Sequence, residues 1–166
     1  IADEIREAWK EADLILTTGG VSVGEKDLLP GVIENLTGNV LFHGIQVKPG
    51  MPTMLSVVNG TPVLSLSGNP FAVEALFEVL AGGYLTDMEA SRYLQKNQMK
   101  ILKQTFVKTG KMKRIVKGRC DESGVYLPQI QKNGQLKNGI GSNCLVIFPE
   151  GERTYTEGEA VRVIRI

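Results

Sequence analysis

The sequence predicts an α/β domain followed by a small all-β domain. In the first part of the chain, apolar residues with helical spacing alternate with short buried runs, an order typical of α/β layers. Beyond residue 97 the helical spacing is absent, and short alternating segments are separated by turn residues, which suits a small β-barrel or sandwich. We therefore expect one domain over residues 1–94 and a second over residues 97–166.

Composition and charge exclude several classes of protein. Hydrophobic residues make up 42% and charged residues 22% of the 166 residues, so we expect a folded chain rather than a disordered one. The 19 basic and 18 acidic residues nearly cancel, which argues against a nucleic acid or a membrane surface as partner. Cys120 and Cys144 are far apart in sequence, so we expect neither a metal knuckle nor a disulfide framework, and a cytoplasmic location is the default.

The predicted order in the first domain is helix, strand, helix, three strands and helix. Because the chain opens at Ile1 inside a helical apolar pattern, we expect this domain to be incomplete at its N-terminus. Asn59-Gly60 predicts a hairpin, while Asn69 and Pro70 are placed to begin the last helix. The strands are predicted over residues 13–18, 40–48, 53–58 and 62–66, and in the second domain over 99–108, 113–120, 125–130, 144–148 and 160–166.

The first motif that could carry chemistry covers residues 17–27, where a strand runs into glycines and hydroxyl side chains. Glycines let backbone N–H groups approach an anion closely, so Gly19, Gly20, Ser22 and Gly24 suit an anion-binding loop. A tight strand-to-helix turn explains the same residues equally well, and Asp27 alone is more simply a helix cap.

Two further loops also follow predicted strands. Lys48-Pro49-Gly50-Met51-Pro52 is a stiff turn that presents Lys48, either as a solvated side chain or as a cation for an oxyanion. The segment Ser67-Gly68-Asn69-Pro70 is either a second anion-binding loop or a well-capped helix start. Together the three loops indicate a phosphate-bearing ligand at one edge of a sheet. His43, in an apolar strand, and Arg114, at a strand start, receive no role from the pattern alone.

These three loops, in this order and spacing, resemble the molybdopterin molybdenumtransferases, a family that includes bacterial MoeA and the E domain of gephyrin. The matching residues read Gly-Gly-Val-Ser-x-Gly-x-x-Asp from Gly19, Lys-Pro-Gly-x-Pro from Lys48 and Gly-Asn-Pro from Gly68. The resemblance implies a three-layer MogA-like α/β domain, truncated at its N-terminus, followed by a small all-β barrel domain.

The resemblance also implies a reaction, in which molybdate is inserted into adenylylated molybdopterin with Mg²⁺ as cofactor and AMP is released. It gives catalytic roles to Asp27, near Mg²⁺ or phosphate, and to Lys48, which with Arg114 would face molybdate. A homodimer is implied for the full-length protein, with no nucleic-acid or membrane partner. The other residues implied to bind pterin, phosphate or molybdate are Gly19, Gly20, Ser22, Gly24, Gly50, Pro52, Ser67, Gly68, Asn69 and Pro70.

The sequence departs from the family's pattern at three positions and in length, and the mildest change is Ser67 in place of the commoner proline before Gly-Asn-Pro. Met51 stands where many members have a second lysine, and Ala72 where many have serine, so each change removes a polar contact from the implied molybdate site. The family's long N-terminal region is absent from this sequence, so this stretch alone is expected to be weak or inactive. The alternative is a molybdopterin- or nucleotide-binding scaffold without catalysis, which would show no molybdate-dependent step.

Overall fold

The computed structural model describes residues 1–22, 27–81, 97–128 and 141–166. They form two compact units, the first made of Ile1–Gln46 and Gly50–Val73 and the second of Val47–Pro49 and Glu74–Ile166. The boundary predicted after residue 94 falls in the segment 82–96, outside the described residues, and stays a prediction.

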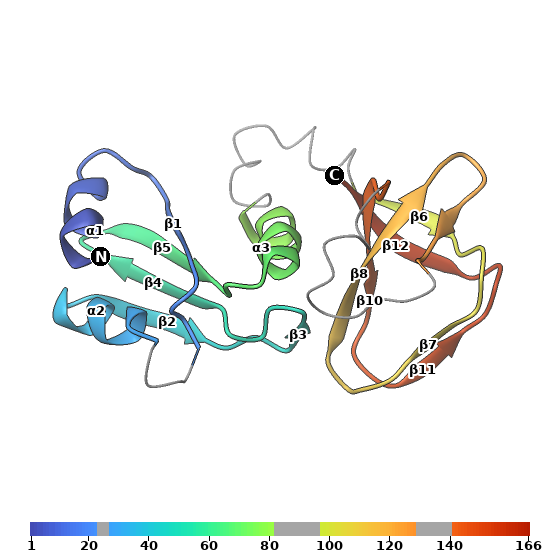
Figure 1. Ribbon diagram of the computed structural model, residues 1–166, viewed down its shortest axis with the longest axis horizontal. Helices are drawn as coiled ribbons and strands as arrows, with labels where there is room; N and C mark the ends of the chain where they lie inside the picture. The colour runs from blue at the N-terminus through green and yellow to red at the C-terminus, as the bar shows by residue number, and fades with distance from the viewer. Residues whose placement is uncertain (23–26, 82–96, 129–140) are drawn as a thin grey trace. The chain divides into compact units, whose positions relative to one another are not determined.

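The first unit contains a four-stranded sheet in the order β1-β5-β4-β2 (Figure 1). Its strands are β1 (Ile15–Thr18), β2 (Asn39–His43), β4 (Met54–Val58) and β5 (Thr61–Leu66). Strand β1 runs parallel to β5, and the other two pairs are antiparallel. The predicted hairpin between β4 and β5 is confirmed, because Asn59 and Gly60 both have positive φ angles, as a two-residue turn of this kind requires.

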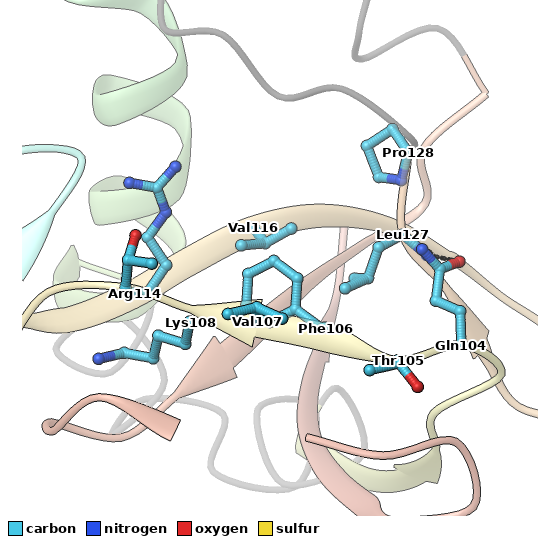
Figure 2. Close-up of a pocket in the computed structure, with 10 residues that line it drawn as sticks. Gln104, Thr105, Phe106, Val107, Lys108, Arg114, Val116, Leu127 and Pro128 are labelled. Atoms are coloured by element: carbon cyan, nitrogen blue, oxygen red, sulfur yellow. Dashed lines mark hydrogen bonds between the residues drawn. The ribbon is translucent and has the colours of Figure 1, made fainter. Parts of the chain in front are cut away.

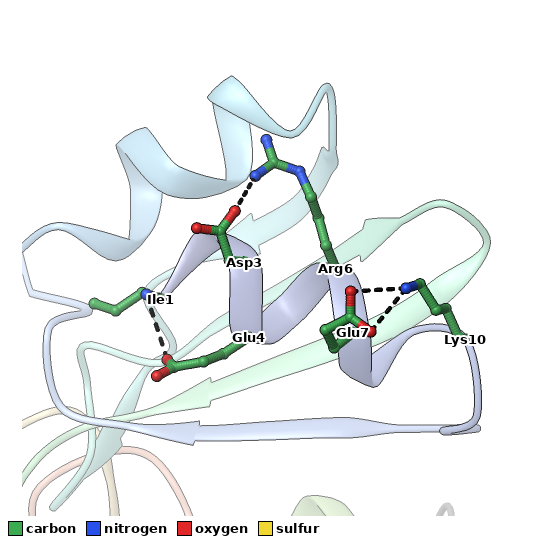
Figure 3. A network of polar contacts seen from close by, with 6 residues as sticks. All are labelled: Ile1, Asp3, Glu4, Arg6, Glu7 and Lys10. Carbon is green, nitrogen blue, oxygen red and sulfur yellow. Dashed lines mark hydrogen bonds and ion pairs between the residues drawn. The ribbon is translucent and has the colours of Figure 1, made fainter.

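Helices α1 (Ala2–Ala8) and α2 (Leu29–Asn35) cover one face of this sheet. Ile5 of α1 and Ile33 of α2 share a buried cluster with Ile15 and Val63, which are register partners on β1 and β5. The outer side of α1 carries exposed ion pairs, such as Asp3 with Arg6 at 2.6 Å and Glu7 with Lys10 at 2.7 Å (Figure 3). Because these pairs are solvated they add little stability, and the apolar face holds the helix in place.

The second unit contains a six-stranded sheet with the path β3-β8-β10-β12-β6, to which β9 adds beside β8. A two-stranded sheet pairs β7 with β11 (Figure 1). The strands are β3 (Val47–Lys48), β6 (Asn97–Ile101), β7 (Phe106–Lys108), β8 (Lys113–Cys120), β9 (Val125–Tyr126), β10 (Cys144–Phe148), β11 (Arg153–Tyr155) and β12 (Ala160–Arg165).

The two sheets of this unit share a core centred on β10, all five residues of which are buried. Phe148 of β10 stacks against Phe106 of β7 at 4.5 Å between ring centroids and meets Tyr155 of β11 at 4.7 Å. Aromatic contacts at this spacing stabilise the packing beyond the area they bury. The small sheet is therefore held against one face of the large one.

Several predicted elements are confirmed and two are wrong. Strands β8 and β10 have the predicted bounds. The strand predicted over residues 40–48 is instead two strands, because the chain bends at Gly44, whose φ is 97°. The strand predicted over 99–108 is likewise divided into β6 and β7, and β11 was not predicted. The last helix of the first part is α3 (Pro70–Leu76), continued by the π-helical turn η1 (Phe77–Ala81).

Candidate functional site

The glycine loop after β1 lies at the carboxyl end of the parallel strand pair. Gly19 and Gly20 have φ angles of 80° and 65°, in the left-handed region that favours glycine. Gly19 N donates to Leu66 O at 2.9 Å, and Leu29 N donates to Gly20 O at 3.0 Å. The loop is thus fixed to β5 on one side and to α2 on the other, at the sheet edge where α/β folds bind ligands.

The loop after β5 lies directly against the glycine loop. A Cβ atom added to Gly68 would be 3.4 Å from the Cα atom of Gly19, at van der Waals contact, so the two loops are close neighbours. Both loops follow strands of the parallel pair, β1 and β5. Two of the three sequence motifs are therefore side by side in the first unit.

Asn69 caps helix α3, as the sequence predicts. Its Oδ1 accepts from Ala72 N at 3.1 Å, and its carbonyl oxygen accepts from Val73 N at 2.9 Å. Asn69 N in turn donates to the hydroxyl of Ser67 at 3.4 Å, a side chain that is almost fully buried. The cap uses the amide oxygen, whereas Asn69 Nδ2 has no acceptor among the described residues and remains a possible donor to a ligand.

The third motif brings Lys48 beside Arg114. Strand β3 pairs in parallel with β8, and Lys48 is the register partner of Arg114. Residues that face each other in this way have side chains on the same face of a sheet. The described residues provide no hydrogen-bond acceptor or carboxylate for either cation. Two neighbouring cations without a counterion disfavour each other, and an oxyanion between them would remove that cost.

Arg114 also lines a pocket of about 270 Å³ within the second unit (Figure 2). It alternates on β8 with Val116, which belongs to the buried cluster, so both lie on the inner face of the strand. Burial lowers the pKa of the Arg114 guanidinium, because charge is less stable away from water. The other lining residues are Gln104, Thr105, Phe106, Val107, Lys108, Thr109, Leu127 and Pro128.

The remaining predicted site residues lie in the turn before β4 and in the segment before α2. Gly50 has a φ of 105°, and its carbonyl accepts from the Thr53 hydroxyl at 2.7 Å, which shapes the turn before the half-buried Pro52. Asp27 is half-buried just before α2, and Gly24 falls outside the described residues. Met51 is 49% exposed and Ala72 is fully buried, so the two departures differ in their access to solvent.

The predicted site residues are divided between the two compact units. Ser22, in the loop after β1, and Asn69, in the loop after β5, belong to the first unit. Lys48 and Arg114 belong to the second. In the described part of the chain, no group of three or more His, Cys, Asp or Glu side chains is arranged to hold a metal ion. The same part contains no helix with the length and apolar content needed to cross a membrane.

Residues 1–87, which carry all three loops, match the family described as "Probable molybdopterin binding domain". The chain belongs to this family. The match includes Lys48, the loop after β1 and the loop after β5, while Arg114 lies beyond it in the β-rich part.

Relatives of known name extend the similarity over both units. The molybdopterin molybdenumtransferase of Staphylococcus aureus (strain COL) is 29% identical over 165 residues, which are 96% of this chain and 39% of the relative. The molybdopterin molybdenumtransferase of Bacillus subtilis (strain 168) is 30% identical over 98% of this chain and 39% of the relative. The crystal structure of the molybdopterin biosynthesis MoeA protein from Pyrococcus horikosii superposes with a TM-score of 0.79 at 27% identity, covering 99% of this chain and 40% of that protein. The chain thus spans about two fifths of the length of these relatives.

The sequence analysis assigned no individual role to three polar residues near the loop after β1. His43, which has no predicted role, has its Nε2 2.7 Å from Val21 O. Thr17 and Ser65 are register partners whose buried hydroxyls have no hydrogen-bond partner within the described residues. A hydroxyl just before each glycine loop was visible in the sequence, but its burial depends on packing that the sequence does not show.

Proposed function

We propose that the protein acts in molybdenum cofactor biosynthesis by inserting molybdate into adenylylated molybdopterin with release of AMP. The observation that carries this proposal is the pairing of Lys48 with Arg114 on one face of a sheet, without a counterion among the described residues. Molybdate is a compact oxyanion, and fixed cations are the groups that bind such anions. Membership of the molybdopterin-binding family and the names of the relatives support the same reaction.

The glycine loops supply the second half of the proposed chemistry. Gly19, Gly20 and Gly68 present backbone close to one another, an arrangement suited to the phosphates of an adenylylated pterin. Ser22, Ser67 and Asn69 Nδ2 would orient the same ligand through hydrogen bonds. In this proposal the two loops bind the pterin nucleotide, and Lys48 with Arg114 binds molybdate.

The described residues could bind Mg²⁺ only through one carboxylate together with phosphates of the substrate. A site made entirely of protein carboxylates is not available within the described residues, but Mg²⁺ is commonly held by one carboxylate together with substrate phosphates. Asp27, half-buried at the end of the glycine loop segment, would supply that carboxylate. When bound, the ion would neutralise phosphate charge. We further propose that the full-length protein is a cytoplasmic homodimer.

Release of AMP tests the proposal directly. Full-length protein would be incubated with adenylylated molybdopterin and Mg²⁺, with and without molybdate, and AMP would be quantified by chromatography. We expect molybdate to stimulate AMP release, and Lys48→Ala and Arg114→Ala each to reduce that stimulation at least tenfold. Binding of the pterin nucleotide without any molybdate-dependent release would instead indicate a scaffold. Binding of AMP but not of molybdopterin would indicate a nucleotide-binding module and refute the pterin role.

A further inference from the structure

His43 ends β2 at the edge of the first sheet opposite β1. His43 is in register with Met54, Met54 with Ser65 and Ser65 with Thr17, so one row crosses the sheet below the glycine loop. The Nε2 atom of His43 is 2.7 Å from Val21 O. A carbonyl oxygen only accepts, so Nε2 carries the proton and donates. The far strand of the sheet therefore holds the loop that follows β1.

This hydrogen bond fixes the direction of one peptide plane. In a trans peptide the C=O and N–H groups point in opposite directions, and the Val21–Ser22 bond is trans. With Val21 O turned toward His43, Ser22 N–H points away from His43. Gly20 O is likewise turned toward Leu29 N, so Val21 N–H points away from the start of α2. Neither N–H group has an acceptor among the described residues.

We propose that His43 is a positioning residue that turns the Val21–Ser22 peptide so that the Ser22 N–H donates to the anionic group of the bound ligand. Val21 helps to make this orientation rigid, because its side chain is 1% exposed and packs in the core cluster. A backbone N–H group without a protein acceptor can donate to a phosphate oxygen. The identity of the ligand as a phosphate-bearing pterin rests on the proposed function, whereas the orientation of the peptide does not.

The test compares His43→Ala with His43→Gln, whose side-chain amide can still donate a hydrogen bond. Leu41→Ala is the matched control, because Leu41 lies on the same strand and is 55% exposed. Backbone NMR would follow the carbonyl shift of Val21 and the order parameter of Ser22. Calorimetry would measure binding of adenylylated molybdopterin and, separately, of inorganic pyrophosphate.

We expect His43→Ala to change the carbonyl chemical shift of Val21 and to lower the order parameter of Ser22. The affinity for both ligands should fall roughly 10- to 100-fold, the loss expected for one hydrogen bond to a charged group. His43→Gln should keep much of the wild-type order of Ser22 and much of the wild-type ligand affinity, and Leu41→Ala should change neither. Unchanged affinity for both ligands in His43→Ala would overturn the positioning role, even if the NMR signals moved. If pyrophosphate binding depends on His43 while wild-type protein fails to bind adenylylated molybdopterin, the positioning role is supported and the proposed function fails.

Discussion

Lys48 and Arg114 are register partners on adjacent parallel strands, and their side chains therefore lie on one face of the sheet. The two residues come from motifs that are far apart in the sequence. Their pairing places two cations where each raises the free energy of the other in the absence of an anion. The pair should therefore lower the stability of the protein without an anion and should favour anion binding.

Replacing either cation should stabilise the empty protein and weaken anion binding. At low salt we expect Lys48→Gln or Arg114→Gln to raise the free energy of unfolding by about 0.2–1 kcal/mol, the cost of like charges in register. The stabilisation that molybdate gives to the wild type should fall sharply in both variants, as measured by thermal unfolding over a molybdate titration. Lys111→Gln, at an exposed turn residue, is the control. Equal stabilisation by molybdate in wild type and both variants would contradict an oxyanion site here.

Asn69 combines a structural and a binding role that substitution can separate. Asn69→Ala removes the acceptor for Ala72 N and should cost about 1 kcal/mol of stability in urea unfolding, a typical value for a lost helix cap. Asn69→Asp keeps a capping oxygen but removes the Nδ2 donor. We therefore expect Asn69→Asp to unfold like the wild type and to bind the pterin nucleotide more weakly. Wild-type affinity in Asn69→Asp would limit this residue to its structural role.

Two glycines near α2 should respond in opposite directions to alanine. Gly31 lies on the exposed side of α2 with no atom within 4 Å of an added Cβ, so Gly31→Ala should stabilise the protein by roughly 0.5–1 kcal/mol. A Cβ at Gly38 would be 2.8 Å from methyl carbons of both Ile33 and Val58. Gly38→Ala should therefore destabilise by about 1–3 kcal/mol through overpacking. Urea midpoints of the two variants that shift in the same direction would contradict this account.

The sequence predicts local structure well wherever a short-range pattern determines it. Strands β8 and β10 have their predicted bounds because alternating side chains and flanking turns define them, and Asn59-Gly60 determines its own hairpin. The break at Gly44 was not predicted, because an apolar run gives no sign that its second half pairs with another sheet. Strand register between distant segments is a tertiary property, so the pairing of Lys48 with Arg114 could be reached only through the structure.

In the candidate site, too, the sequence predicts local features but not tertiary contacts. The glycines and Asn69 could be predicted from the sequence, because these residue types have specific backbone preferences. His43 gave no such signal, since a histidine in an apolar strand is compatible with many environments and its contact is with a backbone carbonyl. The cysteines illustrate the point in the second unit. They are distant in sequence, yet both lie in one buried cluster and interact.

This cysteine pair gives the protein a predicted sensitivity to alkaline pH. Burial, followed by the proximity of Cys120, raises the pKa of the Cys144 thiol from 9.0 to about 12. The folded state thus favours the protonated thiol, so this contribution to stability is fully present below pH 9 and is lost as the pH rises toward 12. The loss should not exceed about 1.4 kcal/mol per pH unit for one proton.

Two measurements check this prediction. The free energy of unfolding should fall between pH 9 and 12, and the fall should be smaller in Cys144→Ala at matched pH. In addition, a thiol reagent at pH 8 should label neither cysteine in the native protein and both in urea, because both side chains are buried and a thiol reacts as its thiolate. Rapid labelling of Cys144 in the native state would show that the thiol is accessible and its pKa ordinary, and the proposed pH dependence would then have no basis.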